Sequence, residues 1–308
     1  MAKQLFDTIE EEVQSLKEER GAIILAHNYQ AGEIQEVADC LGDSLLLAKE
    51  AVKSPAKVIV FAGVRFMAET TKILAPGKMV LLPDLEAGCS LADMVTPEDV
   101  RRWKQEHPNG VVLAYVNTSA AVKAESDYCC TSTNAERVLR AIPEEKEVLF
   151  IPDYFLGSYL KMKTGRDIHL WKGYCPAHAL IDPDRIVALK KEHPSAEFVM
   201  HPECGCLTKS IHLADQVTST DGMIRYVQES PSKEFIIATE IGILHRMRKE
   251  NPNKTFYPAG ENASCSHMQR NTLEKIVRSL EVLEYQIQVP QETARRALLP
   301  LQRMMAIG

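Results

Sequence analysis

The chain has 308 residues, of which 45% are hydrophobic and 25% are charged, and its formal net charge is −6. This composition is typical of a globular enzyme and excludes a disordered or fibrous protein, and the dispersed basic residues give no electrostatic footprint for nucleic acid or an anionic membrane. No run of about 18 apolar residues could span a membrane, and the charged start is not typical of a signal peptide. We therefore expect a cytoplasmic protein that binds neither nucleic acid nor membrane.

The first predicted element is a helix over residues 1–20, and a strand–helix repeat follows it. Apolar strands that end in polar residues open the three copies, at "GAIILAHNYQ", "GVVLAYVNTS" and "AEFVMHPECG". A second series of β-branched runs leads into helical patterns, at "VIVFAGVRFMAE", "VLFIPDYFLGSY" and "FIIATEIGILHR". We place the copies at residues 21–107, 108–195 and 196–288, with a closing helical segment at 289–308.

A third series gives each copy a strand, a short loop and a cysteine. Cys89, Cys175 and Cys265 follow one another at intervals of 86 and 90 residues. Seven residues after each cysteine stands a residue typical of a helix N-cap, and in the first two copies a proline follows it at the first helical position. These residues are Thr96 with Pro97, Asp182 with Pro183, and Thr272. Chance does not readily repeat the cysteine together with the preceding strand and the following helix.

Strands that alternate with helices form parallel sheets covered by helices on both faces. We therefore predict an α/β fold of three similar three-layer αβα units with parallel sheets. If a pseudo-threefold axis relates the units, the three cysteines can converge on it, because ligands bind at the carboxyl ends of such strands. Three thiolates around one point suit an iron–sulfur cluster or zinc, and a four-iron cluster so held keeps one iron open as a Lewis acid.

The other five cysteines lack this register. Cys40 is expected on a helix, in "EVADCLG", while Cys129 with Cys130 and Cys204 with Cys206 form close pairs that have no matching partner motif. Such pairs can form a redox couple or half of a zinc site. A packing role is favoured here, because free cysteine commonly behaves as a small buried hydrophobe.

Residues capable of acid–base chemistry follow the first strand of each copy. They are His27 and Tyr29, Tyr115 and Asn117, and His201 and Glu203. Hydroxyl-rich turns also precede a helical pattern in each copy, and they either bind an anion or simply cap the helix. These turns are Asp43-Ser44, Ser132-Thr133 and Ser219-Thr220. Neither a dinucleotide-binding glycine motif nor a P-loop is present.

Nine motifs, taken together and in order, resemble the quinolinate synthase family of NAD biosynthesis. They are "LAHNYQ", "GDSL", "FAGVRFMAE", "PDLEAGCSLAD", "AYVNTSA", "YCCTSTNA", "GYCPAH", "HPEC" and "STDGMI", and they cover nearly the whole chain. The resemblance implies three similar α/β domains around a pseudo-threefold axis and an oxygen-sensitive [4Fe-4S] cluster on Cys89, Cys175 and Cys265. It also implies a transferase that condenses iminoaspartate with dihydroxyacetone phosphate to quinolinate, with loss of phosphate and two waters.

The same resemblance assigns the residues of the cavity. Among them, we expect Tyr29, Glu203 and His201 to be catalytic, with Tyr29 and Glu203 as the proton-transfer pair, because a carboxylate and a phenol near a metal can exchange protons with a leaving hydroxyl group. The expected substrate-binding residues are His27, Ser44, Tyr115, Asn117, Ser132, Ser219 and Thr220. The chain departs from the family at "ENASCSHM", where some members carry C-x2-C-x2-C, so a redox switch of that kind is not expected. It also departs at "VTST", where the family often has glycine before Ser-Thr.

Two other functions fit parts of this pattern. One is a non-catalytic iron–sulfur sensor, and the other is a zinc-dependent lyase or aldolase on the same scaffold. A sensor needs no ring of His, Tyr, Glu and Ser around its metal, and this favours an enzyme. The aspartate oxidase that supplies iminoaspartate is a further partner that the resemblance suggests.

Overall fold

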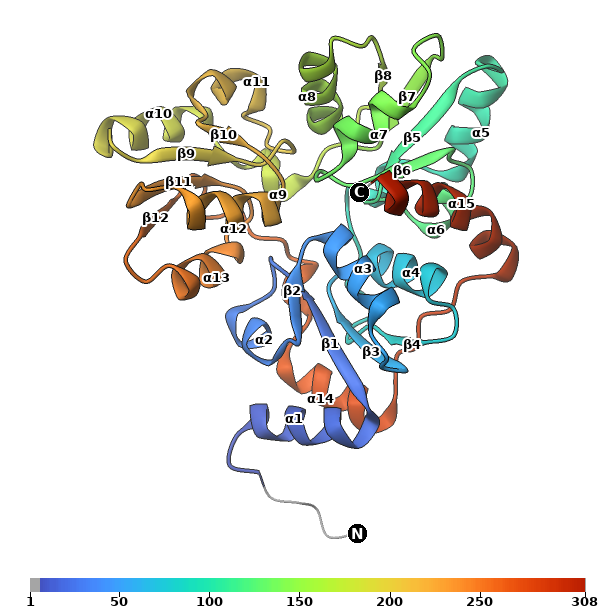
Figure 1. Cartoon of the computed structure of the whole chain (residues 1–308), viewed down its shortest axis with the longest axis vertical. Coiled ribbons are helices and arrows are strands. Elements are labelled where there is room, and N and C mark those ends of the chain that lie inside the picture. The colour runs from blue at the N-terminus through green and yellow to red at the C-terminus, as the bar shows by residue number, and fades with distance from the viewer. Residues whose placement is uncertain (1–5, 308) are drawn as a thin grey trace.

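The computed structural model describes residues 6–307, which form three lobes around a common centre (Figure 1). Each lobe is built on one four-stranded parallel sheet, and the three sheets have equivalent strand orders. The predicted α/β fold of three similar units with parallel sheets is therefore confirmed. Of the two terminal segments predicted to be helical, residues 1–5 and residue 308 lie outside the described residues.

The first lobe has its sheet in the order β2-β1-β3-β4, and all neighbouring strands are parallel. Strand β3 is buried along its whole length, as expected for a β-branched run in a parallel sheet that is covered on both faces. The elements of this part of the chain are α1 (Ile9–Arg20), β1 (Ala22–His27), α2 (Gly32–Val37), β2 (Cys40–Gly42), α3 (Ser44–Lys53), β3 (Val58–Ala62), α4 (Arg65–Leu74), β4 (Met79–Leu81), the 3-10 turn η1 (Ala92–Met94) and α5 (Pro97–Glu106).

The second lobe repeats this order as β6-β5-β7-β8, again with parallel neighbours. Its elements are β5 (Val111–Tyr115), α6 (Ala120–Lys123), β6 (Tyr128–Cys130), α7 (Ala135–Ala141), β7 (Val148–Ile151), α8 (Tyr154–Thr164), β8 (His169–Leu170), α9 (Pro176–Ala179) and α10 (Pro183–Glu192).

The third lobe has the order β10-β9-β11-β12, with parallel neighbours. Its elements, with the last helices of the chain, are β9 (Glu197–Met200), α11 (Leu207–Ser210), η2 (Ile211–Leu213), β10 (Gln216–Val217), α12 (Thr220–Glu229), β11 (Glu234–Ala238), α13 (Ile243–Glu250), β12 (Thr255–Pro258), η3 (Met268–Arg270), α14 (Leu273–Val282) and α15 (Gln291–Ile307).

The helix that follows each of the spaced cysteines begins at its predicted cap. The side chains of Thr96, Asp182 and Thr272 each accept a backbone N–H hydrogen bond from the first turn of α5, α10 and α14. Prolines occupy the first turn of α5 and α10. These three N-cap predictions are confirmed.

These same three helices pack on the next lobe. In α5, Arg101 and Lys104 pair with Glu125 and Asp127 of the second lobe at 2.7 and 2.9 Å. Helix α10 shares a buried cluster with the third sheet. Helix α14 shares one with the first sheet and lies beside α1 (Figure 1). The lobes are thus interlocked in a cycle, and the boundaries 21–107, 108–195 and 196–288 remain a proposal about the sequence repeat.

The last helix, α15, covers the junction between the first two lobes. It packs against α4 of the first lobe and against α6 and β6 of the second. Its buried face consists of Ala297, Pro300, Leu301 and Met304, and the side-chain amide of Asn134 donates to the Met304 carbonyl at 3.0 Å. This helix therefore holds two of the lobes that border the centre.

The helix predicted around Cys40 is wrong. Helix α2 ends at Val37, and Cys40 is the first residue of the edge strand β2, where it pairs with Leu25. The Asp39 carboxylate accepts the Ile24 N–H at 2.7 Å. Pairing with β1 therefore overrides the local helical pattern of this segment, as tertiary contacts commonly do.

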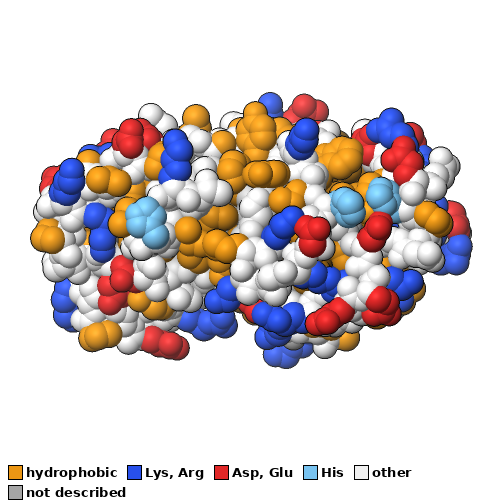
Figure 2. Space-filling view, turned by 90° about the horizontal axis from the view of Figure 1, so that it is seen from above, with side chains coloured by type: hydrophobic (Ala, Val, Ile, Leu, Met, Phe, Trp, Pro, Cys, Tyr) orange, Lys and Arg blue, Asp and Glu red, His pale blue; other side chains and the backbone are white. Residues whose placement is uncertain are grey.

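The outer surface is of mixed charge. On the face shown in Figure 2, basic and acidic side chains are interspersed, and apolar side chains gather between the two halves of the molecule. None of the helices between residues 6 and 307 has both the length and the apolar character that crossing a membrane requires.

Candidate active site

A cavity of about 280 Å³ lies where the three lobes meet, and residues of all three line it. Twelve of the thirteen residues predicted for the site border this cavity: His27, Tyr29, Ser44, Cys89, Tyr115, Asn117, Ser132, Cys175, His201, Glu203, Thr220 and Cys265. The thirteenth, Ser219, is the N-cap of α12 and its hydroxyl accepts the Gly222 N–H. The roles given to these residues remain predictions.

The parallel sheets explain why these residues meet. His27 ends β1, Tyr115 ends β5, and His201 directly follows β9. Carboxyl ends of parallel strands lie at one edge of a sheet, and in each lobe that edge faces the centre. Repetition of one local structure thus brings residues from three distant segments to one cavity.

Cys89, Cys175 and Cys265 contribute one thiol from each copy of the repeat, and all three are half-buried. Burial raises the pKa of all three thiols, that of Cys89 to about 12, and the charge of Glu203 adds to each rise. Thiols in such surroundings stay protonated at neutral pH unless a cation binds them. They are therefore suited to be metal ligands rather than free nucleophiles.

The spacing of the three sulfurs fits a large metal group better than a single ion. Among residues 6–307, the groups whose ligand atoms all lie within 4.8 Å of one another do not include this set of three cysteines. A single zinc ion with Zn–S bonds of about 2.3 Å needs sulfurs about 4 Å apart. The donor set therefore fits an iron–sulfur cluster, whose cysteine ligands bind different iron atoms.

His178, which the sequence did not single out, also lines the cavity. Its Nδ1 is 3.2 Å from Glu203 Oε2, and its Nε2 is 2.9 Å from the Thr239 hydroxyl and 3.3 Å from the Tyr29 hydroxyl. The Tyr29 and Thr239 hydroxyls are 2.5 Å apart. These contacts place one imidazole between Tyr29 and Glu203.

Glu203 is 3% exposed. Burial raises the pKa of its carboxyl group to about 7, and the nearby Tyr115 hydroxyl opposes part of that rise. Within the described part of the chain, Glu203 Oε1 and His178 Nδ1 have no hydrogen-bond partner. Buried polar atoms are rarely left unpaired, so these atoms are available to a bound molecule.

Of the histidines that line the cavity, His27, His178 and His201 are held in the neutral form. Burial lowers the pKa of His27 to about 3 and that of His178 to about 4, and it holds the pKa of His201 well below its usual value. The rings of His178 and His201 stack with centroids 5.2 Å apart, and His201 Nε2 is 3.2 Å from the Ser132 hydroxyl. These imidazoles can therefore donate or accept hydrogen bonds without adding charge.

Two buried carboxylates at equivalent positions support the cysteine loops. Asp153 and Glu240 each stand two residues after the third strand of their lobe, β7 and β11, and Val64 has the equivalent place after β3. Glu240 Oε1 accepts the Cys265 N–H at 3.0 Å, and its Oε2 accepts the Gly242 N–H at 2.6 Å. Burial raises the pKa of Asp153, while N–H groups that include that of Cys175 lower it. These positions recur in register, but they were not singled out in the sequence.

The hydroxyl turns of the three copies also meet. The Thr133 hydroxyl donates to the Asp43 carboxylate and lies 2.7 Å from the Ser219 hydroxyl. Asp43 Oδ1 in turn caps α3, where it accepts the N–H groups of Leu45 and Leu46. One residue from each copy thus contributes to a small network that ties the lobes together beside the cavity.

We expect Thr133→Val to lower the free energy of unfolding by about 1–3 kcal/mol, because it removes the hydroxyl that donates to Asp43 Oδ2. Denaturant unfolding of the substrate-free protein measures this effect. Thr255→Val is the matched control, since Thr255 is an exposed strand residue and such surface changes stay within about 0.5 kcal/mol. Equal stability of the two variants would show that the network does not hold the lobes.

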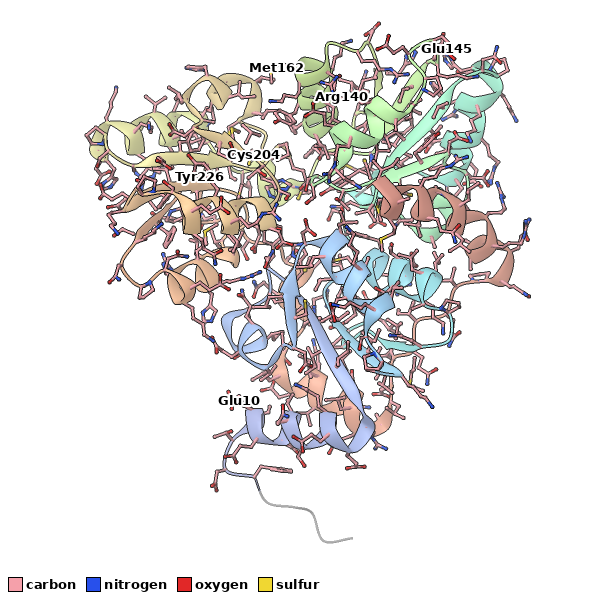
Figure 3. All side chains as sticks on the ribbon, in the orientation of Figure 1. Glu10, Arg140, Glu145, Met162, Cys204 and Tyr226 are labelled. Carbon is pink, nitrogen blue, oxygen red and sulfur yellow. The ribbon has the colours of Figure 1, made fainter. Side chains whose placement is uncertain are left out.

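The four cysteines that form two close pairs in the sequence lie inside the lobes. Cys129, Cys130, Cys204 and Cys206 are all buried, and Figure 3 places Cys204 among the elements of the third lobe. The Cys204 thiol lies 3.1 Å from the Ala238 carbonyl oxygen. Their burial agrees with the packing role expected from the sequence.

The chain is similar over its length to proteins named quinolinate synthase. A profile of the family described as Quinolinate synthetase A protein matches residues 11–306. A quinolinate synthase of Thermus thermophilus is 50% identical over 100% of both chains, and one of Pyrobaculum aerophilum is 50% identical over 96% of this chain and 98% of its own. A solved reductase, the E-1-hydroxy-2-methyl-but-2-enyl-4-diphosphate reductase of Plasmodium falciparum, covers 90% of this chain and 94% of its own at 12% identity, but its TM-score of 0.35 is too low to support an argument.

Proposed function

The chain belongs to the Quinolinate synthetase A protein family, and on this premise we propose that it is a quinolinate synthase with a [4Fe-4S] cluster held by Cys89, Cys175 and Cys265. The proposed reaction condenses iminoaspartate with dihydroxyacetone phosphate and releases phosphate and two waters. The observation that carries the proposal is the cavity at which one thiol from each copy meets a buried carboxylate, a phenol and imidazoles. When bound, the cluster would supply an open iron that acts as a Lewis acid on a substrate oxygen.

Glu203 and Tyr29 are the proposed proton-transfer pair. The carboxyl pKa of Glu203, about 7, suits a group that both accepts and returns a proton at neutral pH. Burial raises the pKa of the Tyr29 phenol well above its usual value, so Tyr29 stays protonated and acts as a donor. The His178 ring lies between the two.

The anionic groups of the substrates have a separate set of donors. Ser44 and Thr220 are the first residues of α3 and α12, where the helix dipole favours negative charge. His27 and Ser132 border the same cavity, and Ser219 adds a hydroxyl behind it. We propose that these groups hold the phosphate or carboxylates.

The nitrogen-bearing carbon skeleton would lie against His201, Tyr115 and Asn117, which line the cavity next to Glu203. His201 Nδ1 is 3.8 Å from Glu203 Oε2, so His201 can orient a substrate group toward the carboxylate. We further propose that the aspartate oxidase which makes iminoaspartate is a partner.

A zinc-dependent lyase or aldolase is the alternative that a specific observation favours. Cys175, His178 and Glu203 place their ligand atoms within 4.8 Å of one another, and a thiolate, an imidazole and a carboxylate are ordinary zinc ligands. Zinc would then replace the cluster as the Lewis acid. Iron and acid-labile sulfide analysis of anaerobically purified protein separates the two metal groups.

Anaerobic turnover tests the proposed function directly. Protein loaded with iron and sulfide is incubated with iminoaspartate and dihydroxyacetone phosphate, and quinolinate is expected to form together with phosphate. Protein with full iron content that forms no quinolinate would instead support the iron–sulfur sensor. Activity that needs zinc and no iron would support the lyase.

A further inference from the structure

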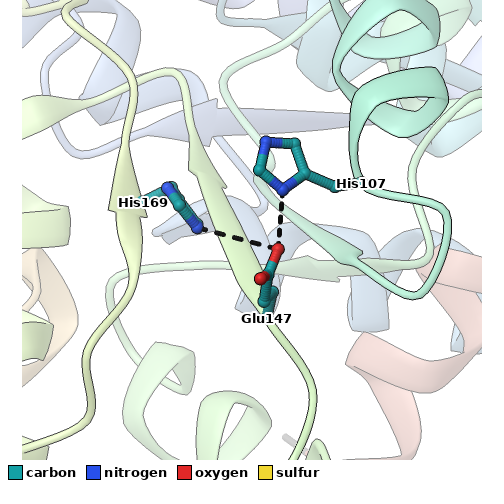
Figure 4. A group of neighbouring side chains, drawn as sticks. All are labelled: His107, Glu147 and His169. Carbon is teal, nitrogen blue, oxygen red and sulfur yellow. Dashed lines mark hydrogen bonds and ion pairs between the residues drawn. The ribbon is translucent and has the colours of Figure 1, made fainter.

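A second group of metal-ligating side chains lies on the outside of the second lobe. His107, Glu147 and His169 place one ligand atom each within 4.8 Å of one another, and Figure 4 shows their polar atoms turned toward a common point. His107 is the C-cap of α5, Glu147 directly precedes β7, and His169 is the first residue of β8. We refer to these three residues as the outer triad.

The outer triad is separate from the cavity. It lies at the amino ends of the strands, whereas the cavity lies at their carboxyl ends. Strand β5 alone has 5 residues and spans about 16 Å at about 3.3 Å per residue. A ligand of the outer triad would therefore contact none of the residues of the proposed reaction.

The ligand atoms of the outer triad would have to move only a short way to bind a metal ion. His107 Nδ1 is 2.6 Å from Glu147 Oε2, and His169 Nε2 is 3.9 Å from the same oxygen. Four-coordinate zinc binds nitrogen and carboxylate oxygen at about 2.0–2.2 Å, which places its ligand atoms about 3.3 Å apart. The Glu147 side chain is 58% exposed, so it can rotate to let an ion in.

The surrounding structure holds the two imidazoles. The Trp103 ring stacks on His107 with centroids 4.5 Å apart and meets the edge of His169 at 5.9 Å. The backbone around Glu147 is fixed because its carbonyl accepts the Val111 N–H at 2.8 Å. The strand register pairs His169 with Leu149. A ligand set on such rigid elements loses little entropy when it binds.

We propose that the outer triad binds a divalent ion of the zinc type, with water in the fourth position. Two imidazoles and one carboxylate suit zinc, copper or nickel rather than magnesium or calcium, which prefer oxygen ligands. His107 ends the helix that follows the first cysteine, and Glu147 and His169 belong to the second sheet. The ion therefore fastens the end of α5 to the lobe on which that helix packs.

Zinc titration of the iron-loaded, tag-free enzyme under anaerobic conditions tests the proposal. Calorimetry should show one equivalent of zinc bound, and zinc should raise the unfolding midpoint. Loss of a residue that only orients a metal ligand lowers metal affinity 10–100-fold. His107→Gln and His169→Asn remove ligands themselves, so each should weaken zinc binding by at least about 10-fold. Neither variant should then gain stability from zinc.

His245→Gln is the matched control. His245 Nε2 is 2.7 Å from Glu36 Oε1 on the surface, so this variant removes a histidine–carboxylate pair that lacks a second histidine. It should bind zinc as the unaltered protein does. Equal zinc affinity in the unaltered protein and in both triad variants would overturn the proposal, as would zinc binding only with loss of iron. Unchanged iron content and circular dichroism show that the variants are folded.

Discussion

Replacing Cys175 by serine is expected to remove most of the bound iron and to reduce quinolinate formation by at least about 100-fold. Loss of a residue that only orients a metal ligand lowers metal affinity or activity 10–100-fold. Loss of a ligand itself should lower them more. Burial raises the pKa of Cys175, so this site already disfavours an ionised ligand, and serine is far harder to ionise than cysteine. Iron, sulfide and initial rates measured on anaerobically reconstituted protein provide the readouts.

Cys40→Ser is the matched control for this loss. Cys40 is also half-buried, and burial also raises its pKa, but it lies on the edge strand β2 of the first lobe. Its variant should keep both iron and activity. Full iron content in the Cys175 variant would contradict the proposed ligand set, whatever its activity.

The repeat also predicts how variants of the other two cysteines should behave. If three equivalent loops hold one group, then Cys89→Ser and Cys265→Ser should lose iron to a similar degree as the Cys175 variant. A mononuclear site made of Cys175, His178 and Glu203 would instead leave those two variants loaded. The three cysteine variants compared side by side therefore also decide between the cluster and zinc.

The sequence predicted the fold and the centre well because both depend on periodic features. Alternation of strand and helix specifies parallel sheets. The confirmed caps at Thr96, Asp182 and Thr272 mark where the helix after each spaced cysteine begins. Residues at the carboxyl ends of such strands must lie at one edge. This is why His27, Tyr115 and His201, which are far apart in the chain, border one cavity.

Residues that belong to a single copy were harder to find. His178 stands three residues after Cys175, but Ala92 and Met268 occupy the equivalent places after the other two cysteines. Asp153 and Glu240 recur in two copies only. A search for repeated chemistry passes over such residues, because their importance comes from the neighbours that the fold supplies.

The packing between lobes could not be predicted from the sequence either. The apolar faces of α5, α10 and α14 show that each helix packs on something, but they do not say on which lobe. The strand at Cys40 was mistaken for a helix because its pairing with Leu25 is a contact across the chain. Local propensity is a weak guide where a non-local ladder decides the conformation.

Glu203→Gln is expected to lower kcat for quinolinate formation by about 10²–10⁴-fold, the usual contribution of a positioned acid or base. Glutamine keeps the shape of the side chain and its hydrogen-bonding capacity near His178 and Tyr115, but it cannot take up a proton. Iron content should stay at the level of the unaltered protein, because Glu203 is not one of the three proposed cluster ligands. The KM for each substrate should change much less than kcat, since the lost interaction belongs to the chemical step.

Glu125→Gln provides the matched control for that change. Glu125 is a buried carboxylate that pairs with Arg101 and Arg296 at 2.7 and 2.6 Å, on the side of the second lobe that packs against α5 and α15. Its variant should lose stability while kcat stays the same. A Glu203 variant with full iron content and an unaltered rate would remove Glu203 from proton transfer. Loss of metal from this variant would instead identify Glu203 as a metal ligand, as the alternative zinc site of Cys175, His178 and Glu203 requires.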